Sequence, residues 1–121
     1  MSAERNTGLE IRTTRFALEI IKLCSELPQS MPAQVLGRQI LRSGTSVGAQ
    51  YREAKRAKSV ADFISKIEGA TQELEETRYW LELLNGSAMV AEKRTAALVS
   101  EAEELTAMLA ASAKTAKRRR Q

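Results

Sequence analysis

The chain has 121 residues, of which 43% are hydrophobic and 28% are charged. This length corresponds to about one domain, and the composition is too apolar for a chain that stays disordered throughout. Histidine is absent and Cys24 is the only cysteine, which excludes the commonest general base, an internal disulfide and a cysteine-based metal cage. We therefore expect no metal site. Cys24 falls on an apolar helix face and is expected to behave as a small buried hydrophobe.

The N-terminal residues are polar and carry no secretion signal, and no apolar run approaches the ~20 residues that span a bilayer. A single thiol is typical of a protein from a reducing compartment. These features predict a cytoplasmic protein that does not enter a membrane.

The first predicted helix spans residues 9–27, where apolar residues recur every three or four positions. They are Leu9, Phe16, Ile20, Leu23, Cys24 and Leu27. Pro28 ends this helix, Ser30 offers an N-cap, and Pro32 suits the first turn of a second helix over residues 32–57. The residues expected to face inward from the second helix are Leu36, Ile40, Ser43, Val47, Tyr51 and Ala54.

The centre of the second helix, residues 43–48, has the unusual sequence SGTSVG. Its two glycines each cost about 1 kcal/mol relative to alanine in a helix interior, so a loop is the alternative. The apolar spacing stays in phase on both sides, which favours a continuous helix. We expect the backbone of a neighbouring helix to approach closely at the glycines.

The third predicted helix starts after Ser59. Ser59 and Asp62 together are similar to a capping box, with Asp62 in the Glu/Gln position. The helix ends at Asn85 and Gly86, a typical C-terminal signal. Its apolar residues alternate steps of three and four, which is the heptad pattern: Val60, Phe63, Ile67, Ala70, Leu74, Thr77, Leu81 and Leu84.

Ser87 is expected to cap the fourth helix, whose apolar residues are Leu98, Val99, Ala102, Leu105 and Leu109. The simplest way to bury four such stripes is an all-α, antiparallel up-and-down four-helix bundle. We place this bundle at residues 9–113, between an N-terminal flank (1–8) and a basic C-terminal tail (114–121).

Basic residues concentrate in two segments. Residues 30–58 carry six basic residues and one acidic residue, and residues 114–121 carry five basic residues. At 100° per residue the four arginines of the second helix share the face opposite its apolar residues, over about 27 Å. Such a row suits the phosphates of one nucleic-acid strand. The candidate nucleic-acid-binding residues are these arginines and two flanking lysines: Arg38, Arg42, Arg52, Lys55, Arg56 and Lys58.

Two other interpretations of this basic face stay open. A basic helix face is often only solvated. Alternatively, the arginines pair with acidic residues on the third helix of another copy and so hold an oligomer together. Those acidic residues are Glu68, Glu73, Glu75, Glu76 and Glu82.

A second surface of the third helix combines small residues with a tryptophan, a residue type that is enriched at protein interfaces. The candidate oligomer-interface residues are Ala61, Ser65, Gly69, Gln72 and Trp80. A contact within one chain is the alternative interpretation.

Enzyme motifs are missing from the sequence: there is no phosphate-binding glycine loop, HExxH, nucleophile elbow or CxxC. The adjacent carboxylates Glu75 and Glu76 point in different directions on a helix. We therefore expect a protein that is not an enzyme and uses no cofactor.

Residues 41–54, LRSGTSVGAQYREA, resemble the signature segment of the four helix bundle family, also called 23S rRNA intervening sequence proteins. The resemblance continues through residues 62–63, 66–67, 73, 76–77 and 79–84, although Gln50 stands where this family has asparagine. It implies a four-helix up-and-down bundle that assembles into a ring-like homopentamer, in a family often encoded within insertions of bacterial ribosomal RNA genes. The family is similar to the accessory variability protein of diversity-generating retroelements, a basic pentamer that binds nucleic acid and a reverse transcriptase.

The sequence thus predicts an oligomeric protein that binds RNA or DNA with low sequence specificity. The alternative is an oligomeric scaffold for a protein partner, such as a polymerase of the reverse transcriptase type.

Overall fold

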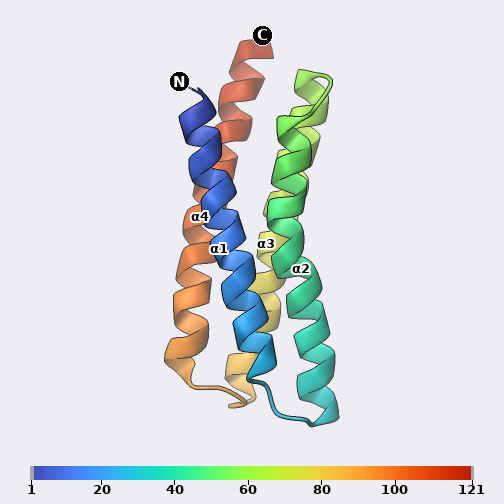
Figure 1. Ribbon diagram of the computed structural model, residues 1–121, viewed down its shortest axis with the longest axis vertical. Coiled ribbons are helices and arrows are strands. Elements are labelled where there is room, and N and C mark those ends of the chain that lie inside the picture. The colour runs from blue at the N-terminus through green and yellow to red at the C-terminus, as the bar shows by residue number, and fades with distance from the viewer. Residues whose placement is uncertain (1, 121) are drawn as a thin grey trace.

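The structure, a computed structural model, describes residues 2–120, with side chains for residues 8–119. It contains four helices, α1 (Ser2–Ser25), α2 (Met31–Lys55), α3 (Val60–Gly86) and α4 (Glu92–Arg120). They run alternately up and down and pack side by side (Figure 1), which confirms the antiparallel four-helix bundle. Both chain termini and the α2–α3 turn lie at one end, called here the terminal end, and the other two turns lie at the opposite end.

The helix limits follow from local capping, with one correction. Ser30 and Ser59 are the N-caps of α2 and α3, as predicted, and accept hydrogen bonds from the amides of Ala33 and Asp62. Ser87 is not the N-cap of α4. It follows α3, its hydroxyl donates to the Leu83 carbonyl, and the chain then turns before α4 begins at Glu92.

The outer helices are longer than the apolar pattern indicates. The backbone of the predicted flank belongs to α1 from Ser2 onward, and the basic tail continues α4 as far as Arg120. Apolar periodicity marks only the buried part of a helix, so it does not report where an exposed polar helix ends.

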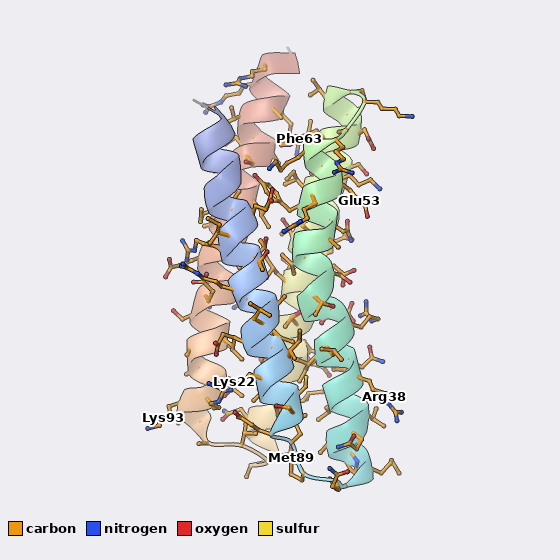
Figure 2. All side chains as sticks on the ribbon, viewed as in Figure 1. Lys22, Arg38, Glu53, Phe63, Met89 and Lys93 are labelled. Atoms are coloured by element: carbon orange, nitrogen blue, oxygen red, sulfur yellow. The ribbon has the colours of Figure 1, made fainter. Side chains whose placement is uncertain are left out.

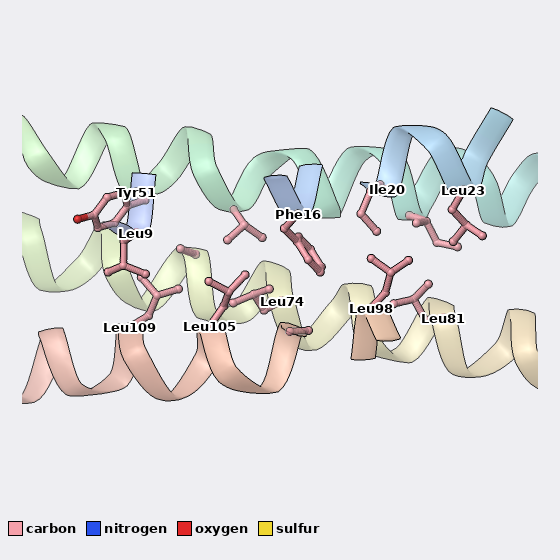
Figure 3. Packing of buried hydrophobic residues seen from close by; sticks show 14 of the residues in the cluster. Leu9, Phe16, Ile20, Leu23, Tyr51, Leu74, Leu81, Leu98, Leu105 and Leu109 are labelled. Atoms are coloured by element: carbon pink, nitrogen blue, oxygen red, sulfur yellow. The ribbon is translucent and has the colours of Figure 1, made fainter. Parts of the chain in front are cut away.

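The core runs lengthwise between the four helices, and Figure 3 shows part of it, from Tyr51 and Leu109 to Leu23 and Leu81. The expected apolar stripes of α1, α2 and α4 are largely buried, and so is α3 from Ile67 to Leu84. At the start of α3 the prediction was wrong, because Ile64 enters the core whereas Val60 stays 41% exposed and Phe63 is only half-buried. The heptad seam therefore opens towards the terminal end.

The glycine-rich centre of α2 is a continuous helix, as predicted. Side chains of α1 fill most of the space that the glycines leave, and at Gly48 the α1 backbone also comes close, with the Thr13 carbonyl carbon 3.7 Å from an added Cβ. A Cβ at Gly44 would lie 2.8 Å from Cγ1 of Ile20, and one at Gly48 would lie 3.1 Å from Oγ1 of Thr13. The small residues thus allow α1 and α2 to pack closely.

Among the polar contacts that join neighbouring helices, one lies inside the core and another beside it. The buried Thr77 hydroxyl donates to Oγ of Ser43 at 2.7 Å, which links α3 to α2. Arg12 of α1 donates to both carboxylate oxygens of Glu101 on α4, at 2.6 and 3.0 Å. Across residues 2–120 no helix combines the length and apolar character needed to cross a membrane.

Candidate nucleic-acid interface

The four arginines predicted to form a row, three within α2 and Arg56 at its C-cap, do not form one row of unpaired cations. Arg38 and Arg56 are exposed and have no carboxylate partner among the described side chains, and Arg38 points away from the bundle (Figure 2). Eighteen residues separate them, which is five helical turns, so they lie directly in line. Arg42 and Arg52 lean about 40° to opposite sides of this line.

Arg42 reaches across to α3, where its guanidinium pairs with Glu76 and, at 3.3 Å, with Glu73. Glu76 also accepts a hydrogen bond from Nε1 of Trp80 at 3.1 Å. Two of the acidic residues considered as partners in another copy are therefore engaged within the same chain. This arrangement stabilises the α2–α3 pair and reduces the positive charge that Arg42 presents to solvent.

Arg52 leans the other way, towards α1. Its guanidinium lies 3.7 Å from Glu10 and 3.4 Å from the Thr14 hydroxyl, and Lys55 also pairs with Glu10. The hydrogen bond and the charge of Lys55 are the main causes that lower the pKa of Glu10 below its ordinary value, with smaller contributions from Arg52 and Arg56. Glu10 is thus held ionised and offsets part of this cationic cluster.

The structure brings the two basic segments together at the terminal end, because α2 and α4 run in the same direction (Figure 1). Lys55 and Lys58 line one groove together with Arg119 of α4. The sequence predicts that the tail assists the arginines and lysines of residues 38–58 in binding phosphates, but it does not place the two segments side by side. Residues 30–58 and residues 114–121 each carry a net charge of +5. Combined with the predicted up-and-down topology, these charges were the signal that both segments contribute to one basic surface.

Five cations of this end have no carboxylate partner among the described residues. They are Arg56, Lys58, Lys114, Arg118 and Arg119. Lys117, by contrast, pairs with Glu68 of α3 at 3.0 Å. We call these five residues the terminal-end cations.

The predicted interface residues on α3 are divided between two environments. Ala61, Ser65 and Gln72 are exposed. Gly69 lies beneath Gln50 of α2, and Trp80 packs half-buried against the core. Large exposed apolar side chains occur on α1, α2 and α3, and those on α1 are Ile11, Leu18 and Ile21, which are 46%, 58% and 46% exposed.

The described side chains are not arranged for metal binding or for thiol chemistry. Within the part of the chain that the structure describes, no group of three Cys, Asp or Glu residues is arranged to hold a metal ion. Cys24 is half-buried and its thiol donates to the Gly37 carbonyl. Burial raises the pKa of this thiol, which disfavours the reactive thiolate.

Residues 11–111 match the model of a family described as 23S rRNA-intervening sequence protein. The chain belongs to this family. It is also similar to a crystal structure of a protein of unknown function from the S23 ribosomal protein family of Bacteroides thetaiotaomicron, with 36% identity and a TM-score of 0.85. The match covers 90% of this chain and 97% of that one. No curated protein matches this chain, and neither description names a catalytic activity.

Proposed function

We propose that this chain is a non-enzymatic, cytoplasmic protein that assembles into an oligomer and binds RNA or DNA with low sequence specificity. The observation that carries the proposal is the convergence of the terminal-end cations, which have no carboxylate partner in the part of the chain that the structure describes. An unpaired cation binds phosphate and releases counterions without first breaking an ion pair. The connection of the family with 23S rRNA favours RNA as the natural ligand.

The candidate residues 38–58 contribute unequally to phosphate binding in this proposal. Arg56 and Lys58 contact phosphates directly, and Arg38 extends the surface along the same line of α2. Arg42, Arg52 and Lys55 contribute less, because each has a carboxylate partner.

The opposite charge on another face helps to orient the ligand. A groove between α3 and α4 is lined by four glutamates and by Arg78, which pairs with Glu103 at 2.9 Å, and the excess negative charge repels a polyanion. The glutamates are Glu75, Glu82, Glu92 and Glu103. A nucleic acid therefore approaches the terminal end and avoids the α3–α4 groove.

Self-association is the second part of the proposal. The exposed apolar side chains of α1 offer a larger hydrophobic contact than the small residues Ala61 and Ser65 of α3. The pentamer that the family resemblance implies would place several terminal ends in one assembly. Several weak phosphate-binding surfaces then act together, which raises the overall affinity.

The test compares two triple variants that remove the same charge from different places. The first replaces Arg56, Lys58 and Arg119 by Gln at the terminal end. The control replaces Arg15, Lys22 and Lys93, which are exposed and have no carboxylate partner among the described residues. Lys22 and Lys93 lie near the opposite end of the bundle (Figure 2). Fluorescence anisotropy with a labelled single-stranded RNA is measured over a range of salt concentrations.

We expect the first variant to bind the RNA at least about tenfold more weakly, with the salt slope reduced by about 0.7 for each phosphate that the variant no longer neutralises. The control should stay within about threefold of the unsubstituted chain, because only long-range, screened attraction changes. Equal losses of affinity in both variants would show that net charge alone matters and would refute the proposed site. No binding by the unsubstituted chain, together with nuclease-resistant capture of a protein, would favour the scaffold function.

A further inference from the structure

A groove of about 670 Å³ opens at the terminal end, between α4 and the α2–α3 turn. This volume lies in the range of pockets that take small organic groups. All four helices contribute to its apolar wall, which includes Leu9 of α1, Ala54 of α2, Phe63 of α3 and Met108 of α4. Phe63 supplies the aromatic ring and lies near the terminal end (Figure 2).

The groove exists because the side chains at this end are too small or too exposed to fill it. Ala54, Ala57, Ala111 and Ala116 line it at positions where larger residues would close the bundle. Val60, which the heptad pattern places in the core, is 41% exposed here. Apolar surface thus faces solvent next to a concentration of positive charge.

The rim of the groove is polar and cationic. Lys58 and Arg119 line it and have no carboxylate partner among the described residues, whereas Lys55 is offset by Glu10. The hydroxyls of Ser112 and Thr115 also line the groove. Neither hydroxyl has a hydrogen-bond partner in the described part of the chain, so both are free to bind a polar ligand.

Three features together define the occupant. An acyl chain would use the apolar wall but form no hydrogen bond with the two hydroxyls, and it would bring one negative charge at most. A nucleotide offers a flat base for the aromatic and apolar wall, polar edges for the hydroxyls and a phosphate for the rim. We propose that this groove takes one unpaired nucleotide of the bound strand, with its base against Phe63 and its phosphate on Lys58 and Arg119.

This inference rests on the proposed function and adds a preference for single-stranded over duplex nucleic acid. In a duplex the bases are paired and stacked, so that only the phosphates are accessible to the terminal-end cations. A single strand supplies both the phosphates and a base. Blocking the groove should therefore weaken single-strand binding and spare duplex binding.

The experiment uses Ala111→Leu to fill the groove and Ala110→Leu as its matched control. Both alanines are exposed on α4, and only Ala111 lines the groove, so the added side chain disturbs no core packing. A second variant, Phe63→Leu, removes the ring but keeps an apolar residue. The probes are a 12-nucleotide single-stranded RNA with one 2-aminopurine, a blunt duplex of the same sequence, and free AMP.

We expect Ala111→Leu and Phe63→Leu each to bind the single strand about tenfold more weakly, the usual effect of removing one base-stacking interaction. Duplex affinity should change less than about twofold, and Ala110→Leu should resemble the unsubstituted chain with both probes. 2-Aminopurine fluorescence should change on binding to the unsubstituted chain and not on binding to Ala111→Leu.

Three results would overturn the inference, in distinguishable ways. If single strand and duplex bind but Ala111→Leu and Ala110→Leu behave alike, the groove is not used and the proposed function stands. If AMP occupies the groove as tightly as the 12-mer does, the ligand is a free nucleotide rather than part of a strand. If neither nucleic acid binds, the proposed function fails and the groove assignment fails with it.

Discussion

Replacing Gly44 by alanine tests how α1 and α2 pack at the centre of the signature segment. A Cβ added there would lie 2.8 and 3.0 Å from the two γ carbons of Ile20 and 3.3 Å from its Cβ. Because these atoms belong to the branched, fully buried base of the side chain, Ile20 has no flexible end that can move aside.

Two opposing effects set the change in the free energy of unfolding that Gly44→Ala causes. Alanine gains about 1 kcal/mol over glycine in a helix interior, and overpacking a core typically costs about 1–3 kcal/mol. We therefore expect Gly44→Ala to lower the free energy of unfolding by about 1 kcal/mol. Gly8→Ala is the control, since no atom of the described side chains lies within 4 Å of its added Cβ, and it should raise that free energy by about 0.5–1 kcal/mol.

The assay is urea unfolding followed by circular dichroism at 222 nm, at one fixed chain concentration because assembly would make stability depend on concentration. A double-mutant cycle with Ile20→Ala isolates the interaction between the two positions. In that background the γ carbons are gone, so Gly44→Ala should become stabilising. If Gly44→Ala already stabilises the chain that keeps Ile20, the steric reasoning is wrong.

Three further predictions address charge and assembly. Because the pKa of Glu10 is lowered, its ion pair with Lys55 stabilises the fold fully above pH 4.5. This stabilisation disappears as the pH falls through the lowered pKa. In urea unfolding at a series of pH values, the free energy of unfolding of Glu10→Gln should therefore fall less steeply at acidic pH than that of the unsubstituted chain. Arg42→Gln should leave RNA affinity in anisotropy within about twofold, because exposed ion pairs contribute little and its guanidinium is already engaged; a decrease as large as that of the terminal-end triple variant would contradict this. Replacing Leu18 and Ile21 together by Glu should reduce the mass in light scattering to that of a single chain, and an unchanged mass would exclude α1 as the assembly surface.

Local sequence determined much of the architecture. Apolar periodicity placed the four helices and most of the core, since each stripe must be buried against another. Ser30 and Ser59 could be recognised as caps because capping depends only on the neighbouring amides. The continuity of α2 through Gly44 and Gly48 followed from apolar spacing that stayed in phase on both sides.

Tertiary structure decided the features on which the proposed function depends. Helical register gives the angle of Arg42 and Arg52 about their own axis, but only packing shows that Glu76 and Glu10 lie within reach of them. The heptad pattern could not show that the α3 seam is partly exposed at Phe63. The pattern describes one helix, whereas burial of its residues depends on the side chains that the other three helices supply. The meeting of the α2 and α4 cations is likewise a property of chain direction in the assembled bundle, and no single segment encodes it.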